Sequence, residues 1–431
     1  MSQENKLNKF SCNVPFNLIS ACSLGTILEW YDFSLYAYVA PTISTHFFPN
    51  KNQITSIMLV YSIFAVGFIV RPLGAILFGH FGDREGRKKA LVVSMLLMAS
   101  MTCVMCIVPT YKQIGLMAPA LLIIVRILQG IAIGGETIGA GSLIIESVQN
   151  MKRGFPTALI WASSGIGILL CSVVVALTTM IFSPSIFTEW AWRIPFALGG
   201  VTGLVGIYFR NKIKESAVFR LVQVRHEVVK TPFLEAISKF KKEVLITIGL
   251  YALCAITLYL LFVFMPVYAS KILGLPFKQV VLINSLTMAF MILLVPIAGY
   301  CSDIFGRKIV LLISASGFLI LSYPVYLFTF NGSLSGLVIA QSIFAIFTAG
   351  FHGPVTSAVL EMFPSYVRYS AVAVGYNVSY SLFGATTPLI AVYLVEKFEN
   401  NLAPSFYLSF GALLAIFAII NMKETYKAQL S

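Results

Sequence analysis

The chain has 431 residues, of which 58% are hydrophobic and only 11% charged. A soluble domain carries about 25% charged residues, so this composition excludes an ordinary soluble protein. The formal net charge of +13 does not indicate nucleic-acid binding, because most Lys and Arg residues fall in the loops on one side of the expected membrane spans. That asymmetry follows the positive-inside rule and predicts that both termini lie in the cytoplasm.

Apolar stretches recur along the chain, each close to the roughly 20 residues that span the hydrocarbon core of a bilayer. They predict an all-α membrane protein with twelve transmembrane helices in two six-helix bundles. The expected spans in chain order are 17–43, 54–79, 90–109, 115–140, 156–182, 191–209, 244–270, 279–300, 309–330, 334–358, 370–395 and 403–421. The expected domains are a cytoplasmic N-terminal tail (1–16), a first bundle (17–209), a cytoplasmic linker (210–243), a second bundle (244–421) and a short cytoplasmic tail (422–431).

Local signals add detail to the linker and the second bundle. Residues 233–240 predict one surface helix within the otherwise charged linker. Several prolines inside apolar spans predict kinks or broken helices, because proline lacks the N–H that an α-helix needs. These prolines are Pro266, Pro296, Pro324, Pro354 and Pro388.

Two charged loop motifs occur once in each half of the chain. The loops at 79–88 and 299–308 share Gly, Asp, Gly, Arg and Lys in the same order and spacing. A Glu and an Arg seven residues apart also follow the fourth span and the tenth span. Such repeats indicate a duplicated six-helix unit, so the two bundles should be pseudo-symmetric.

The repeated charges predict a cytoplasmic gate. The loop glycine permits a tight turn, and the acids and arginines can pair at the membrane surface. In the first half, Asp83, Arg87, Glu146 and Arg153 are expected to form one interdomain ion network that holds one access state. The complete candidate gate comprises Asp83, Arg87, Glu146, Arg153, Asp303, Arg307, Glu361 and Arg368.

Ionisable residues also lie within the spans of the first half. Glu29 and Asp32 are three residues apart and therefore share one helix face. A charge at membrane depth costs about 2.5–3.5 kcal/mol on insertion scales, so such residues usually face a cavity and pair with one another. We expect the two acids to neutralise Arg71 and Arg126, and to take part in proton coupling or substrate contact. Glu136 is a further candidate.

Aromatic residues indicate one class of substrate. An aromatic cage would bind a quaternary ammonium group by cation–π attraction. The candidate contacts are Trp30, Tyr31, Tyr36, Tyr251 and Tyr259. A dicarboxylate would instead need cations such as Arg71 and Arg126, and the sequence alone leaves these two alternatives open.

Several motifs in this order resemble one known family. They are 29–33 (EWYDF), 71–74 (RPLG), 126–136 (RILQGIAIGGE), 153–154 (RG) and 192–196 (WRIPF), together with the repeated loops. The chain resembles the metabolite:proton symporter family of the major facilitator superfamily, whose members carry proline and betaine, α-ketoglutarate, citrate or shikimate. Segments 361–371, 376–379 and 422–425 are most similar to the proline/betaine transporters. Osmosensing members have a long C-terminal extension, so osmotic activation is not expected for a chain that ends at Ser431.

The resemblance implies a secondary active transporter in a bacterial inner membrane. Proton-coupled symport of a proline- or betaine-like zwitterion is the favoured activity, with a small-molecule substrate, a proton and the lipid bilayer as partners and a monomer as the working unit. A dicarboxylate symporter, an exchanger or efflux carrier and a transporter-like sensor are the alternatives. No enzyme activity, cofactor or metal site is expected, since the sequence has no hydrolase or metalloprotease motif and no His cluster. Cys103 and Cys106 form a CxxC within a span and are expected to be packing residues.

Overall fold

The protein is described here by a computed structural model, which places residues 16–49, 53–148, 152–224, 229–330 and 332–430. In these ranges the chain forms helices and no strand. Eleven helical segments among them are long and apolar enough to cross a membrane. The 23-residue helix α2 (Phe16–Tyr38) provides the twelfth, although it carries Glu29 and Asp32. The expected all-α class with twelve transmembrane helices is confirmed.

The first bundle contains six long helices, and its second helix is broken in the middle. α4 ends at Ile69 and α5 begins at Arg71, because Pro72 has no N–H for a continuous hydrogen-bond ladder. After α2, the elements of this bundle are α3 (Ala40–Phe47), α4 (Gln53–Ile69), α5 (Arg71–Glu85), α6 (Arg87–Ile107), α7 (Tyr111–Ile114), α8 (Met117–Ser147), α9 (Gly154–Ile181), α10 (Pro184–Glu189), η1 (Ala191–Arg193) and α11 (Ile194–Lys212).

The linker carries two short helices, and the second bundle follows with two interrupted helices. The linker helices are α12 (Ala217–Val224) and α13 (Pro232–Lys239). The second bundle comprises α14 (Lys241–Leu258), η2 (Tyr259–Phe264), α15 (Met265–Val267), η3 (Tyr268–Ile272), α16 (Phe277–Phe305), α17 (Arg307–Phe330), α18 (Leu334–Glu361), α19 (Arg368–Ser379), η4 (Tyr380–Gly384), α20 (Thr387–Phe398) and α21 (Ala403–Asn421).

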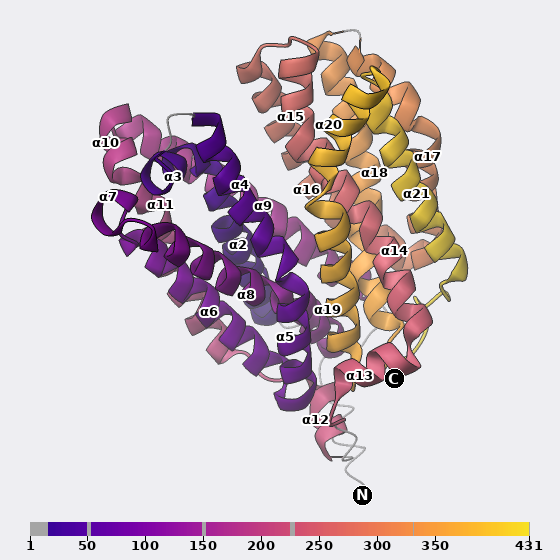
Figure 1. The fold of residues 1–431 in the computed structure, drawn as a ribbon. Coiled ribbons are helices and arrows are strands. Elements are labelled where there is room, and N and C mark those ends of the chain that lie inside the picture. The colour runs from indigo at the N-terminus through magenta and orange to yellow at the C-terminus, as the bar shows by residue number, and fades with distance from the viewer. Residues whose placement is uncertain (1–15, 50–52, 149–151, 225–228, 331, 431) are drawn as a thin grey trace, which may run out of the picture.

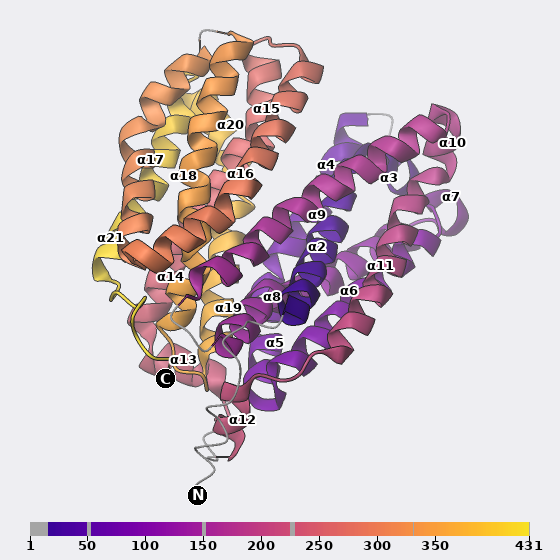
Figure 2. The ribbon, with the colours of Figure 1, turned by 180° about the vertical axis from the view of Figure 1, so that it is seen from behind.

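The two bundles converge at one end and separate at the other. Figures 1 and 2 show this from opposite sides: α5 and α19 meet near α12 and α13, whereas α10 and α15 lie far apart. We call the end that carries α12 and α13 the linker end. Across the interface α5 packs against α19, and α9 packs against α16 and α18. Large apolar side chains such as Met180 and Phe417 are exposed on the outside, as expected of a surface that faces lipid.

The segment between the bundles contains one expected helix and one that was not expected, and the helix before it ends later than expected. The predicted surface helix at 233–240 is present as α13, whereas α12 was not predicted. α11 continues to Lys212, so Arg210, which the expected boundary put in the linker, is a buried helical residue. A buried partner compensates the charge of Arg210, which hydropathy alone could not reveal. The expected N-terminal tail, 1–16, lies outside the described residues apart from Phe16.

The prolines expected to mark kinks have different outcomes. Pro266 lies between the π-helical turns η2 and η3, and Pro388 follows the π-helical turn η4. Pro296, Pro324 and Pro354 lie inside the continuous helices α16, α17 and α18. π-Helical turns are uncommon and often occur at functional sites. The interruptions therefore concentrate in the two helices of the second bundle that contribute Tyr259 and Tyr380.

The repeated loop glycines have a backbone geometry that only glycine adopts readily. Gly86 has φ 111° and ψ 149°, and Gly306 has φ 104° and ψ 153°. Each lies between two consecutive long helices and lets the chain reverse without a linker. A side chain in this conformation costs about 1–3 kcal/mol.

We predict that Gly306→Ala lowers the thermal unfolding temperature of the purified protein, by an amount equivalent to about 1–3 kcal/mol. Gly67→Ala is the matched control, because a Cβ at this helical position would meet no atom closer than 3.6 Å. Unfolding in detergent, followed by circular dichroism, measures both. Equal unfolding temperatures for the two variants would contradict the assigned role of the loop glycine.

Candidate functional site

Charged side chains gather at the linker end of the bundle interface. Arg87, at the start of α6, lies 3.2 Å from Asp83 and 3.0 Å from Glu146. Glu146 also accepts a hydrogen bond from Arg368 of the second bundle at 2.9 Å. All four side chains are buried, so the charges are compensated by one another. We call these four residues the first cluster.

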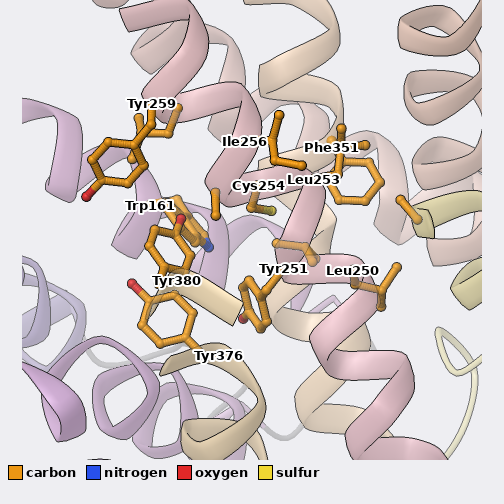
Figure 3. Packing of buried hydrophobic residues seen from close by; sticks show 14 of the residues in the cluster. Trp161, Leu250, Tyr251, Leu253, Cys254, Ile256, Tyr259, Phe351, Tyr376 and Tyr380 are labelled. Carbon is orange, nitrogen blue, oxygen red and sulfur yellow. The ribbon is translucent and has the colours of Figure 1, made fainter. Parts of the chain in front are cut away.

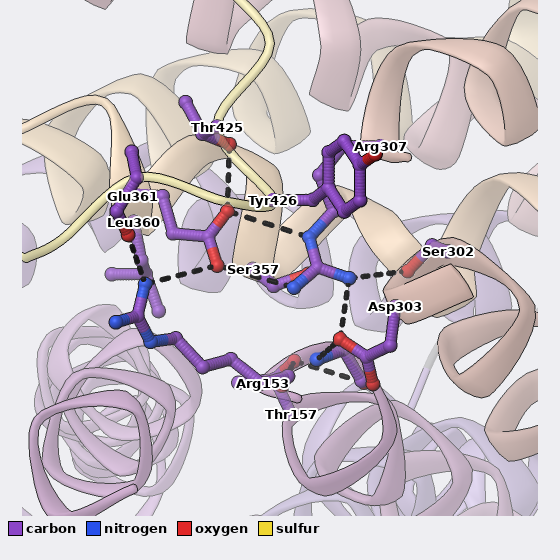
Figure 4. Close-up of polar contacts among 12 residues, drawn as sticks. Arg153, Thr157, Ser302, Asp303, Arg307, Ser357, Leu360, Glu361, Thr425 and Tyr426 are labelled. Carbon is purple, nitrogen blue, oxygen red and sulfur yellow. Dashed lines mark hydrogen bonds and ion pairs between the residues drawn. The ribbon is translucent and has the colours of Figure 1, made fainter. Parts of the chain in front are cut away.

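An equivalent set of residues forms a second cluster (Figure 4). Arg307, at the start of α17, lies 2.7 Å from Asp303 and 3.2 Å from Glu361. Glu361 pairs at 3.6 Å with Arg153 of the first bundle. The second cluster thus repeats the first with the two bundles exchanged, as the duplicated motifs would require of a pseudo-symmetric pair.

In each cluster an aspartate also caps a helix of the opposite bundle. Asp83 accepts a hydrogen bond from the backbone N–H of Ser370 at 2.8 Å, in the first turn of α19. Asp303 accepts from the N–H groups of Gly154 and Phe155, at 2.8 and 3.0 Å, in the first turn of α9. These N–H groups have no partner within their own helix, and the helix dipole favours a negative charge there. Each bundle therefore binds the N-terminus of one helix of the other bundle.

The structure corrects how the expected gate residues are grouped. The sequence placed Arg153 with Asp83, Arg87 and Glu146, whereas Arg368 occupies that place and Arg153 belongs to the second cluster. The physical reason is the capping just described. Each arginine stands at the start of a helix that is docked on the opposite bundle, so its side chain reaches the glutamate of that bundle.

Two further glutamates join the clusters and were missed by the sequence analysis. Glu215 accepts the backbone N–H of Lys88 at 3.0 Å, and Glu424 accepts the N–H of Arg307 at 3.0 Å. The hydroxyls of the following residues, Ser216 and Thr425, donate to Glu146 and Glu361 at 2.7 and 2.6 Å. A usable signal was present in the sequence: Lys-Glu-Ser at 214–216 and Lys-Glu-Thr at 423–425 each follow the last helix of a bundle.

Arg71 lies between the bundles at the break between α4 and α5. Its guanidinium donates to the side-chain oxygen of Asn377 at 3.2 Å and to the hydroxyl of Tyr376 at 3.3 Å, both in α19. The aromatic rings of Tyr376 and Tyr380 lie 5.5 and 5.4 Å from its charged carbon. Its Nη1 has no hydrogen-bond partner among the described residues. Arg71 is thus a buried cation with one donor group left for a ligand.

Asp32 and Arg126 are joined indirectly, through two neutral side chains. Thr102 of α6 donates to Asp32 at 2.9 Å, and Gln129 of α8 donates to Thr102 at 3.2 Å. Gln129 in turn accepts from Arg126 at 2.9 Å. The guanidinium of Arg126 lies 4.3 Å from the ring centroid of Tyr36. The second carboxylate oxygen of Asp32 has no partner among the residues that the structure describes.

Glu29 is buried, and within the described ranges neither of its carboxylate oxygens has a hydrogen-bond partner. It lines a cavity of about 10 Å³ together with Asp32 and Glu136, which is close to the room that a single water needs. Glu136 forms a buried ion pair with Arg210 of α11 and also accepts from Ser94 at 3.0 Å. Arg210 is therefore a site residue that the sequence analysis missed.

The expected mutual neutralisation of Glu29, Asp32, Arg71 and Arg126 is corrected accordingly. No ion pair joins any two of them in the described part of the chain. Arg71 is turned toward the neutral side chains of the second bundle, because its helix faces the interface. The acids remain inside the first bundle, where Glu136 already has Arg210 as its partner.

The candidate aromatic contacts are distributed over three different places. Tyr31 and Tyr36 donate to backbone carbonyls of the first bundle, at 2.8 and 3.2 Å. Tyr259 lies 5.6 Å from Phe68 across the interface. Tyr251 packs near the ring of Trp161, and the rings of Tyr376 and Tyr380 also lie beside Trp161 (Figure 3). Trp30 and Trp161 line one small cavity.

The residues expected to form one cage therefore do not surround a common space. Trp161, Tyr376 and Tyr380 are aromatic site residues that the sequence analysis did not single out. No group of three or more His, Cys, Asp or Glu side chains is placed to hold a metal ion within the described residues.

Comparisons with known proteins identify the family of the chain. The family model "Major Facilitator Superfamily" matches residues 22–295 and 279–428. The proline/betaine transporter of Escherichia coli (strain K12) is 34% identical over 417 residues, covering 94% of this chain and 83% of that protein. The glycine betaine/proline/ectoine/pipecolic acid transporter OusA of Dickeya dadantii (strain 3937) is 33% identical with the same coverage. These matches confirm the resemblance that the motifs indicated.

Solved structures show the same fold at lower sequence identity. The proton:xylose symporter XylE bound to 6-bromo-6-deoxy-D-glucose superposes with a TM-score of 0.80 at 19% identity, covering 95% of this chain and 96% of that chain. The inward-open conformation of the xylose transporter XylE from E. coli superposes with a TM-score of 0.64 at 20% identity, covering 96% and 98%.

We predict that Glu136→Gln destabilises the protein by about 3–5 kcal/mol, because it leaves the buried charge of Arg210 uncompensated. Glu85→Gln is the matched control: its ion pair with Lys89, at 3.3 Å, is exposed and contributes about 0–1 kcal/mol. The double variant Glu136→Leu/Arg210→Met should recover much of the loss. Thermal unfolding in detergent measures all three, and a Glu136→Gln variant as stable as the control would refute the pairing.

Proposed function

The chain belongs to the Major Facilitator Superfamily, and from that premise we propose that it imports a small zwitterion together with a proton by alternating access. It is a membrane transport protein and not an enzyme. The relatives named as proline and glycine betaine transporters make such solutes the favoured substrates. The proposed setting is the inner membrane of a bacterium, with a single chain as the working unit.

The observation that carries the proposal is a set of buried polar atoms, in the first bundle and at its interface with the second, that have no hydrogen-bond partner among the described residues. They are the Nη1 donor of Arg71, the indole N–H of Trp30, both oxygens of Glu29 and one oxygen of Asp32. The large majority of buried side-chain polar atoms in proteins are hydrogen-bonded, so unpaired charged groups at membrane depth need an explanation. Donors suited to a carboxylate and acids able to hold a proton provide one.

The positions of Arg71 and Arg126 favour a zwitterion over a dicarboxylate as the substrate. A dicarboxylate needs two cations within its reach, and of the two candidate arginines within the spans, Arg71 and Arg126, Arg71 contacts the second bundle. Arg126 is enclosed in the first bundle by Phe33, Tyr36 and Phe64, whose ring centroids lie 5.2, 4.3 and 5.3 Å away. A zwitterion has one carboxylate, and Arg71 alone can satisfy it.

Charge balance offers a basis for coupling. With Glu29 and Asp32 both ionised, their charges sum to zero with those of Arg71 and Arg126, and the two anions weaken the attraction of Arg71 for the carboxylate of the substrate. Protonation of one acid leaves a net positive site that accepts the carboxylate. Proton and substrate therefore stabilise each other's binding, which is the thermodynamic requirement for symport. Glu136 is held by Arg210 and takes a supporting role in this scheme.

The two clusters serve as the gate of the proposed cycle. They join the bundles at the linker end while the bundles separate at the opposite end (Figure 1). From the positive-inside rule we assign the linker end to the cytoplasm. The arrangement then corresponds to an outward-facing state, and release of the substrate requires the pairs across the interface to break.

We predict that energised membrane vesicles containing the protein take up radiolabelled proline or glycine betaine, and that a protonophore abolishes the accumulation. α-Ketoglutarate, citrate and shikimate complete the panel. Asp32→Asn should abolish accumulation but retain exchange of labelled for unlabelled solute, because exchange needs no net proton movement.

Each alternative gives a different result in this assay. Uptake of an organic acid alone would overturn the zwitterion assignment. Accumulation that persists with the protonophore would overturn proton coupling and point to exchange or another ion. Absence of all uptake by the folded protein would favour efflux or a sensor.

We predict that Glu146→Gln opens the linker end. The change removes the anion that joins Arg87 and Arg368, a loss of about 1.5–3 kcal/mol and so roughly a ten- to hundredfold shift in population. Spin labels at the exposed positions Arg84 and Ile304, in a cysteine-free background, would report a longer distance between α5 and α16. Glu85→Gln, at the same end but outside the clusters, is the control. An unchanged distance distribution in the folded variant would refute the gate.

A further inference from the structure

A second cavity lies between the bundles and has no charged lining. Its volume is about 20 Å³, and its walls include Trp30 and Trp161 of the first bundle with Met288, Met291 and His352 of the second. The indole N–H of Trp30 is buried and has no partner among the described residues. The cavity is therefore an aromatic and thioether-lined space at the interface, separate from the cavity of acids inside the first bundle.

Trp161 is held in a defined orientation across the interface. Its indole N–H donates to the hydroxyl of Thr356 at 2.6 Å, and its ring lies 4.8 Å from that of His352. Trp161 is also 6.4 Å from both Tyr376 and Tyr380 (Figure 3). An anchored ring presents its π-face without a large loss of side-chain entropy when a ligand binds.

The same two tyrosines connect Trp161 to Arg71. The guanidinium of Arg71 lies 5.5 and 5.4 Å from the rings of Tyr376 and Tyr380. A second cation at those tyrosine faces would be repelled by Arg71. A positive group on a ligand held by Arg71 is therefore directed past the tyrosines to Trp161 and Trp30.

We propose that Trp30 and Trp161 form the subsite for the cationic nitrogen of the substrate, while the free Nη1 of Arg71 binds its carboxylate. The proposal rests on the function proposed above and names the substrate class more narrowly: a zwitterion whose quaternary or secondary ammonium is bound by cation–π attraction. Tryptophan is the strongest such partner, and this subsite has no carboxylate to compete for the cation.

The flexible lining allows the subsite to admit a group larger than the present cavity. Met288 and Met291 are unbranched and can change rotamer to make room, whereas Trp161 is fixed by its hydrogen bond. The subsite differs from the cage expected from the sequence. Tyr31 and Tyr36 are bonded inside the first bundle and do not line it.

The test compares glycine betaine with 3,3-dimethylbutyrate, which has the same shape and carboxylate but a carbon atom in place of the charged nitrogen. Both compete with labelled substrate for uptake by the full-length protein in proteoliposomes. In the unmodified protein glycine betaine should bind about 10- to 30-fold more tightly than the isostere. In Trp161→Leu this ratio should fall toward 1, and in Trp161→Phe it should fall only in part.

Trp190→Phe is the matched control, because Trp190 is half exposed and away from the interface cavity. If Trp161→Leu does not fold, fluorinated tryptophan replaces it. The chain has four tryptophans, and fluorination weakens the π-face with little change in volume. The KM for glycine betaine should rise with each added fluorine, while the inhibition constant of the isostere stays constant.

The outcomes separate this proposal from the proposed function. If the unmodified protein transports neither proline nor glycine betaine, the proposed function is overturned. Transport of glycine betaine with a ratio that Trp161→Leu and fluorination leave unchanged would overturn the subsite alone. A ratio near 1 in the unmodified protein would do the same, because it would show that the positive charge of the ligand is not recognised.

Discussion

The capping of each bundle's helix by an aspartate of the other bundle is the interaction on which the arrangement of the molecule depends. Asp83 and Asp303 accept the unpaired first-turn N–H groups of α19 and α9. The arginines that precede or begin those helices, Arg368 and Arg153, then reach the glutamates of the opposite bundle. Because both contacts are made at the linker end, they hold the bundles together there, while the bundles separate at the opposite end (Figure 1).

The duplication has kept one set of charges in both halves and another in one half only. The linker-end charges occur twice, since each bundle needs a capping acid and a crossing arginine. The charges at membrane depth, Glu29, Asp32, Arg71, Arg126 and Glu136, occur in the first half, and the corresponding spans of the second half carry none. The second bundle instead supplies neutral amide and aromatic groups to the interface. Proton chemistry is thus assigned to the first bundle in the mechanism that we propose.

The interrupted helices explain why neutral groups of the second bundle can reach Arg71. Tyr259 and Tyr380 begin π-helical turns, and Arg71 follows the break before Pro72. At such interruptions a helix changes the direction of its side chains without losing its length. The hydroxyl of Ser381, within η4, donates to the backbone of Phe68 at 2.6 Å, so two interruptions meet directly at the level of Arg71.

The sequence by itself determined the membrane class, the twelve helices, the duplication and the eight charged residues of the two clusters, because hydropathy and repeated motifs are local properties of the chain. Only the tertiary structure decided the partners. Arg210 could not be predicted as a site residue, since its partner Glu136 is distant in sequence. The same holds for the exchange of Arg153 with Arg368, and for Trp161 as an interface residue. A buried charge or ring is stabilised by whatever lies beside it in space, and that neighbour is chosen by how the helices pack.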